Sequence, residues 1–105
     1  MTQYTENPSP KVFNIDFDGT LTTGEYTDNP GPEQSVIDRV MELYIKGHII
    51  IIWTARQWDQ APFMIGWLIS HSVPFHGVMM GKGGSNYYLD DKAIDFNKFY
   101  FGEEF

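Results

Sequence analysis

The sequence predicts an α/β fold of three layers, in which a mostly parallel sheet of about four strands carries helices on both faces. Short apolar runs alternate with helical patterns along the chain, as in βαβ units. The run "HIIIIW" at residues 48–53 is typical of a strand buried on both faces of a parallel sheet. The connections at residues 19–32 and 83–89 are too short to hold a folded cap domain.

The first half of the chain predicts one strand, one loop and one helix. "KVFNIDF", residues 11–17, is rich in β-branched and aromatic residues and indicates the first strand. Residues 22–32 contain Gly, Pro, Asn and Asp and predict a loop or small flap. Apolar residues at a spacing of three to four predict an amphipathic helix over residues 33–46, which Gly47 can end.

The second half predicts another helix and two more strands. Asp59 is expected to cap the helix, and Pro62 falls in its first turn, where a missing N–H does no harm. Residues 75–81 predict a third strand and residues 86–91 a fourth. The aromatic segment 92–105 is expected to pack back onto the domain or to meet a partner chain.

Composition limits the class of protein. The chain of 105 residues predicts one domain over residues 11–105, preceded by a flexible arm at residues 1–10. A net charge of -7 argues against binding to nucleic acid or to an anionic membrane. The absence of cysteine excludes thiol catalysis and zinc thiolate sites. Without an apolar leader or long apolar run, we expect a soluble cytoplasmic protein.

Polar side chains gather where the predicted strands end, which in a parallel sheet is the edge where ligands bind. Each has an ordinary explanation when taken alone, such as a turn residue, a helix cap or a surface charge. Their convergence at one edge favours a functional site. These residues are Asp16 and Asp18 after the first strand, Thr54 and Arg56 after the second, Lys82 after the third, and Asp90 and Asp91 at the end of the fourth.

The carboxylates of this set predict a metal ion. Four carboxylates in one crevice repel one another unless a cation neutralises them. Oxygen ligands without His or Cys suit a hard ion, so we expect Mg²⁺ rather than zinc.

Four segments resemble, in order and spacing, the signature motifs of the haloacid dehalogenase superfamily, and in particular its small capless phosphatases. They are "DFDGTLT" at residues 16–22, "IIIIWTAR" at residues 49–56, "GKGG" at residues 81–84 and "YYLDDKAID" at residues 87–95. The resemblance runs from about residue 12 to residue 96 and implies the superfamily's Rossmann-like fold without a cap domain.

The resemblance implies a role for each carboxylate. Asp16 would be the nucleophile that forms an aspartyl-phosphate, which divides a slow hydrolysis into two easier steps. Asp18 would protonate the leaving alcohol and then take a proton from the attacking water, and its backbone carbonyl would bind the metal. The Mg²⁺ site would use Asp16, Asp18, Asp90 and Asp91, and sequence leaves open which of Asp90 and Asp91 contacts the ion directly.

The resemblance also implies a phosphate-binding set. The Thr54 hydroxyl and the following N–H of Ala55 would bind the transferring phosphoryl group, and Lys82 would offset charge on it and on the nucleophile. Gly19 has two compatible interpretations: an ordinary turn residue, and one that turns backbone N–H groups toward the phosphoryl group. For Arg56, contact with substrate and surface pairing both stay open. The full set is Asp16, Gly19, Thr54, Ala55, Arg56 and Lys82.

For several other residues we expect structural roles and no part in the chemistry. Gly83 follows Lys82 where relatives often have proline, so the lysine loop is expected to be more mobile. Trp58 and Tyr26 are expected to pack rather than to touch a leaving group. Core or surface roles are expected for His48, His71 and His76, and not metal binding.

The sequence therefore predicts a Mg²⁺-dependent phosphatase that hydrolyses a small phosphomonoester, such as a sugar phosphate or nucleotide. Without a lid the site lies open, and a second copy of the chain is a candidate for covering it. One alternative is a non-catalytic domain that binds phosphate or a partner. The other is a phosphotransferase, which would pass the phosphoryl group to an acceptor other than water.

Overall fold

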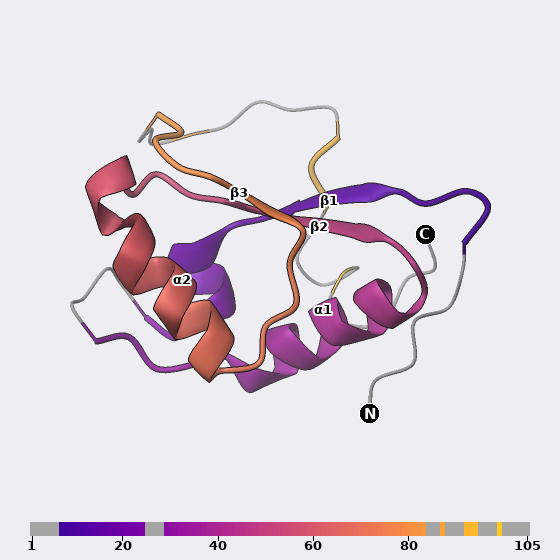
Figure 1. Ribbon diagram of the computed structural model, residues 1–105, viewed down its shortest axis with the longest axis horizontal. Coiled ribbons are helices and arrows are strands. Elements are labelled where there is room, and N and C mark those ends of the chain that lie inside the picture. Colours follow the sequence, from indigo (N-terminus) through magenta and orange to yellow (C-terminus); the bar gives the residue numbers. More distant parts are fainter. Residues whose placement is uncertain (1–6, 25–28, 84–86, 88–91, 95–98, 100–105) are drawn as a thin grey trace.

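A parallel sheet of three strands runs across the middle of the molecule (Figure 1). The computed structural model describes residues 7–24, 29–83, 87, 92–94 and 99. Within these residues the strands are β1 (Val12–Ile15), β2 (Ile49–Trp53) and β3 (Gly77–Met79), in the spatial order β1-β2-β3. Both neighbouring pairs are parallel. The predicted α/β class with parallel strands is confirmed, and no further domain is present in the part of the chain that the structure describes.

Two helices provide the crossovers between the strands. Helix α1 (Gln34–Ile45) connects β1 to β2, and helix α2 (Ala61–Ser70) connects β2 to β3. The predicted amphipathic pattern of the first helix is confirmed, because four of its apolar residues are buried at a spacing of one turn. These are Val36, Ile37, Val40 and Leu43.

Helix α2 begins later than the sequence suggests. Trp58–Gln60 forms a single 3₁₀ turn, so Asp59 lies inside that turn and does not cap the helix. The N-cap is Gln60, whose side chain makes no capping hydrogen bond. Pro62 does fall in the first turn of α2, as predicted, where its missing N–H costs nothing.

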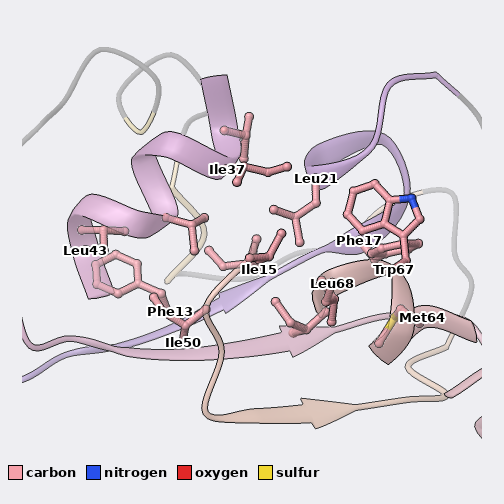
Figure 2. Packing of buried hydrophobic residues seen from close by; sticks show 14 of the residues in the cluster. Phe13, Ile15, Phe17, Leu21, Ile37, Leu43, Ile50, Met64, Trp67 and Leu68 are labelled. Carbon is pink, nitrogen blue, oxygen red and sulfur yellow. The ribbon is translucent and has the colours of Figure 1, made fainter. Parts of the chain in front are cut away.

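The hydrophobic core lies between one face of the sheet and the two helices (Figure 2). Phe13 and Ile15 of β1 and Ile50 and Ile52 of β2 point to this face, since alternate residues of a strand share a side. Residues of α1 and α2 pack on them, as Figure 2 shows. The other helical layer predicted by the sequence is not among the described residues.

The opposite face of the sheet is open in the described part of the molecule. Val12 is 63% exposed and Met79 is 56% exposed, although both are strand residues. A hollow of about 520 Å³ on this face is lined by Asn14, Ile51, Trp53, Gly77, Val78 and Met79. In the isoleucine run of β2, Ile50 and Ile52 on the core face are therefore fully buried. Ile49 and Ile51 on the open face are only partly buried, so the run is not buried on both faces as the sequence predicted.

The sequence predicted a fourth strand toward one end of the chain and a flexible arm at the other end. The predicted fourth strand, apart from the single described residue Tyr87, lies outside the described residues. At the other end, the Asn7 side chain donates a hydrogen bond to the carbonyl oxygen of Lys46, which ties residues just before β1 to the end of α1. Among the described residues, no helix combines the length and apolarity needed to cross a bilayer.

Candidate functional site

Side chains that follow the three strands meet at the carboxyl end of the sheet. Asp16 directly follows β1, Thr54 directly follows β2, and Lys82 lies on the loop after β3. The Nζ atom of Lys82 is 3.2 Å from Oδ1 of Asp16. The backbone N–H of Lys82 donates to the carbonyl oxygen of Thr54 at 3.0 Å. The structure thus brings together three residues that the sequence places on three separate strand ends.

Only one of the two carboxylate oxygens of Asp16 is engaged by the described residues. Its Oδ1 atom accepts a hydrogen bond from the Phe17 N–H at 2.8 Å and faces the Lys82 ammonium. Its Oδ2 atom accepts no hydrogen bond from the described residues, and 42% of the side chain is exposed. A carboxylate fixed through one oxygen can present the other to a phosphorus atom or to a cation.

The chain turns sharply after Asp16. The compact loop Phe17–Leu21 contains Gly19 with φ +76°, a left-handed conformation that glycine adopts without a steric penalty. The Gly19 N–H donates to the Thr22 hydroxyl oxygen at 3.0 Å. Gly19 is therefore a turn residue, as one interpretation predicts, and its role in turning backbone N–H groups toward a phosphoryl group stays a prediction.

Asp18 forms a bidentate ion pair with Arg56. The guanidinium Nε lies 2.9 Å from Oδ2 and Nη2 lies 2.8 Å from Oδ1 of the carboxylate. The Arg56 side chain is 1% exposed and that of Asp18 is 23% exposed. Of the two roles left open for Arg56, the structure therefore shows pairing, although the pair is largely buried and does not lie on the surface.

Aromatic rings enclose the Arg56 guanidinium. Its Cζ atom lies 5.2 Å from the centroid of the Phe17 ring and 5.3 Å from that of Phe63. The Arg56 Nη1 donates a long hydrogen bond of 3.4 Å to Oε1 of Gln60. The rings and the carboxylate together compensate for burying a cation, because each interacts favourably with positive charge.

Thr54 organises the loop after β2. Its side chain is fully buried, and its hydroxyl oxygen accepts the Arg56 N–H at 3.1 Å. Ala55, between them, is exposed. The Gly81 N–H donates to the Arg56 carbonyl at 2.7 Å, so the loops after β2 and β3 are joined by backbone hydrogen bonds.

Lys82 is nearly enclosed at this junction. Its side chain is 9% exposed. The ammonium contacts Asp16 on one side and lies 4.7 Å from the Trp53 ring centroid on another. The lysine predicted from the glycine-rich segment is thus held near the predicted nucleophile.

The described site balances two carboxylates with two cations, because Asp16 faces Lys82 and Asp18 faces Arg56. Within the described ranges, no group of three or more His, Cys, Asp or Glu side chains is placed to hold a metal ion. Asp90 and Asp91, the other predicted metal ligands, lie outside these ranges. The carboxylate oxygens that are described are hard donors, and their chemistry fits Mg²⁺.

The remaining candidate residues lie away from the carboxyl end of the sheet or outside the described residues. Trp58 is 63% exposed, so the expected packing role is wrong for this side chain, because the 3₁₀ turn directs it away from the core. Tyr26 lies outside the described residues. His48 and His76 lie near the amino ends of strands, where each Nδ1 accepts a backbone N–H at 3.0 Å.

Sequence reasoning missed two aromatic contributors to the site. Trp53 contacts the Lys82 ammonium and Phe63 contacts the Arg56 guanidinium. The position of Trp53 carried a usable signal: it directly precedes Thr54 in a strand, so alternation places it opposite the core residue Ile52. Phe63 carried no such signal, since its spacing matches the core face of α2.

The fold has a counterpart among solved structures. A crystal structure of a Vibrio cholerae protein, described only as a target, matches this chain with a TM-score of 0.75 and 28% sequence identity. The match covers 86% of this chain and 87% of that chain. No family model matches the chain, and no curated protein matches it. The comparison therefore supports the small parallel α/β fold over nearly the whole length and supplies no activity.

Proposed function

We propose that this protein is a Mg²⁺-dependent phosphomonoester hydrolase that acts through an aspartyl-phosphate on a small phosphorylated metabolite. One observation carries the proposal. The Asp16 carboxylate is fixed through Oδ1 by Lys82 and by the Phe17 N–H, while Oδ2 accepts no hydrogen bond from the described residues. This arrangement suits a nucleophile, because one oxygen positions the group and the other attacks.

The first step forms the covalent intermediate. Oδ2 of Asp16 attacks phosphorus, and the bond from phosphorus to the alcohol oxygen breaks with its electron pair on that oxygen. Asp18 supplies the proton that neutralises the departing alcohol. Each Asp18 oxygen accepts one hydrogen bond from Arg56 and keeps a second lone pair that can carry the proton.

The second step restores the enzyme. Water attacks the phosphorus of the aspartyl-phosphate and gives a proton to Asp18, and the bond from phosphorus to Asp16 breaks. Lys82 and the loop that begins at Thr54 offset the negative charge of the phosphoryl oxygens in both steps. The products are inorganic phosphate and the original Asp16 carboxylate.

Mg²⁺ would be held by the side chain of Asp16, the backbone carbonyl of Asp18, and Asp90 or Asp91. When bound, it would reduce the repulsion between the phosphate and the site's carboxylates. The substrate is proposed to be small and soluble, such as a sugar phosphate or a nucleotide, because no cap domain is present among the described residues to select a larger one.

The test is phosphate release from a panel of phosphomonoesters, with Mg²⁺ and with EDTA. We expect the wild-type protein to release phosphate only with Mg²⁺, and Asp16→Asn to lose this activity. Asp38→Asn is a matched control, because Asp38 is an exposed aspartate on α1 whose side chain bonds only the Gln34 side chain among the described residues.

Each other outcome identifies a different function. Release that survives in Asp16→Asn contradicts the nucleophile assignment. No release from any ester favours a non-catalytic binding domain. Release that rises with added alcohol, together with a new phosphoester product, favours a phosphotransferase.

A further inference from the structure

The backbone before Lys82 is well anchored, whereas the backbone after it is rich in glycine. The N–H groups of Gly81 and Lys82 donate to the carbonyl oxygens of Arg56 and Thr54. Gly83 follows and is exposed, with nothing within 4 Å of the position that a Cβ atom would take. A long side chain leaving such a loop retains considerable rotamer freedom unless its charged end is held.

The Trp53 ring lies against the charged end of Lys82. The distance from Nζ to the ring centroid is 4.7 Å, within the range of a favourable cation–π contact. The same ammonium lies 3.2 Å from Asp16 Oδ1. Since the lysine side chain is 9% exposed, the ring contact is made by a largely desolvated cation, where such contacts are strongest.

The strand geometry explains why Trp53 can reach this position. Trp53 is the last residue of β2 and points to the face opposite Ile50 and Ile52. Asp16 continues β1 with extended dihedral angles, φ -70° and ψ 152°, so alternation places its side chain on the side of Asn14 and not on that of Ile15. Trp53 and Asp16 therefore approach Lys82 from neighbouring strands on the same side of the sheet.

We propose that Trp53 is a positioning residue that holds the Lys82 ammonium beside Asp16 through its ring face. The physical advantage lies in its neutrality. A carboxylate at position 53 would also attract the ammonium, but it would add a negative charge near the phosphoryl oxygens. An aromatic face attracts the cation and leaves its charge available. The contact itself follows from the structure, and its catalytic consequence rests on the proposed function.

A spectroscopic test examines the contact without requiring activity. Protons held over an aromatic face resonate upfield, so NMR should find the ε-methylene protons of Lys82 upfield of those of the exposed Lys11. In Trp53→Leu this displacement should disappear, and in Trp53→Phe, which keeps a ring, it should persist in part. Lys82 resonances that coincide with those of Lys11 in the wild-type protein would overturn the proposal.

A kinetic test measures whether the contact between Trp53 and Lys82 affects catalysis. With any ester that the wild-type protein hydrolyses, we expect Trp53→Leu to lower kcat about 30-fold, as for the loss of a desolvated cation–π contact, with a smaller change in KM. Trp53→Phe should recover much of kcat. Met79→Leu is the control, because Met79 is the exposed neighbour of Trp53 on the open face, and it should retain wild-type kinetics.

Together, the NMR and kinetic tests distinguish the positioning role of Trp53 from the proposed hydrolase function. If the wild-type protein hydrolyses no ester, the proposed function fails, and the NMR result alone decides whether Trp53 holds Lys82. If the protein is active but folded Trp53→Leu keeps the wild-type kcat, the positioning role is wrong while the proposed function stands. An equal loss of kcat in Trp53→Leu and Trp53→Phe also contradicts it, because the ring would then not be the feature that matters.

Discussion

Arg56 donates two hydrogen bonds to Asp18, at 2.9 Å from Nε and 2.8 Å from Nη2, across a separation of 38 residues. The pair joins the loop after β1 to the loop after β2 and is largely buried. Both ions are removed from bulk water, so each depends on the other to compensate its desolvation. This pair therefore contributes to holding the two loops of the candidate site together.

Removing Arg56 should destabilise the fold strongly. In Arg56→Met the Asp18 carboxylate is left partly buried without its cation, and breaking a buried pair in this way costs about 3–5 kcal/mol. We expect the free energy of unfolding in urea to fall by this amount. Adding Asp18→Asn should recover part of the loss, because it removes the unpaired charge. Equal stability of the single and double variants would contradict this account.

Thr54 should be more sensitive to the loss of its hydroxyl group than to the loss of its methyl group. Thr54→Val keeps the volume but deprives the buried Arg56 N–H of its acceptor, which should cost about 1–3 kcal/mol of unfolding free energy. Thr54→Ser keeps the acceptor and loses one methyl group, for a cost of about 0.8 kcal/mol. Urea unfolding of the two variants gives the comparison, and a Val variant more stable than the Ser variant would refute the proposed role of the hydroxyl.

The sequence predicted the parts of the fold that depend on local pattern. The isoleucine run predicted β2, and the amphipathic spacing predicted α1 to within one residue at each end. The sequence also predicted that Asp16, Thr54 and Lys82 meet at one edge, because each follows a strand and parallel strands end at the same edge of the sheet. These inferences need only the order of elements along the chain.

The arrangement of the layers needed more than local pattern. With strand order β1-β2-β3 and right-handed crossovers, α1 and α2 must lie on the same face of the sheet. A helix reaches the other face only when a strand is added on the opposite side of β1. Nothing in the sequence reports spatial strand order, and so the one-sided placement of these helices could not be predicted.

Side-chain pairing was equally hidden from the sequence. Arg56 was considered for substrate contact and for surface pairing, and the structure instead buries it against Asp18. Which cation meets which carboxylate depends on loop conformations of a few residues, such as the left-handed turn at Gly19. These conformations are set by tertiary hydrogen bonds, for example from Gly81 N–H to the Arg56 carbonyl.

Gly19 and Gly66 should respond to alanine in opposite directions. Gly19 has φ +76°, and an added Cβ would make only an ordinary contact of 3.6 Å with the Gly24 carbonyl oxygen. The cost of Gly19→Ala is therefore backbone strain, about 1–2 kcal/mol. Gly66 lies within α2 with nothing within 4 Å of an added Cβ, so Gly66→Ala should stabilise the protein by about 0.5–1 kcal/mol. Thermal unfolding of both variants tests the contrast, and a change of the same sign in both would contradict it.

His48 should make the protein less stable in mild acid. The buried imidazole accepts the Lys11 N–H through Nδ1 at 3.0 Å, which requires that nitrogen to be unprotonated. Burial lowers the pKa of His48 from its ordinary value of 6.5, and the nearby positive charges of Lys11, Lys46 and Arg39 lower it further. The unfolded chain therefore binds a proton at this residue more readily than the folded one.

The sign of the pH effect follows from this difference. Because the folded pKa is the lower one, the contribution of His48 to stability is complete above pH 6.5 and is lost as the pH falls from there through the folded pKa. His48→Asn offers an uncharged acceptor to the Lys11 N–H at every pH. We expect urea unfolding between about pH 7.5 and about pH 5 to show a steeper loss of stability in the wild-type protein than in this variant. Equal slopes of stability against pH in the two proteins would contradict this prediction. They would mean that another residue takes up the proton and that His48 binds a proton equally readily in the folded and unfolded states.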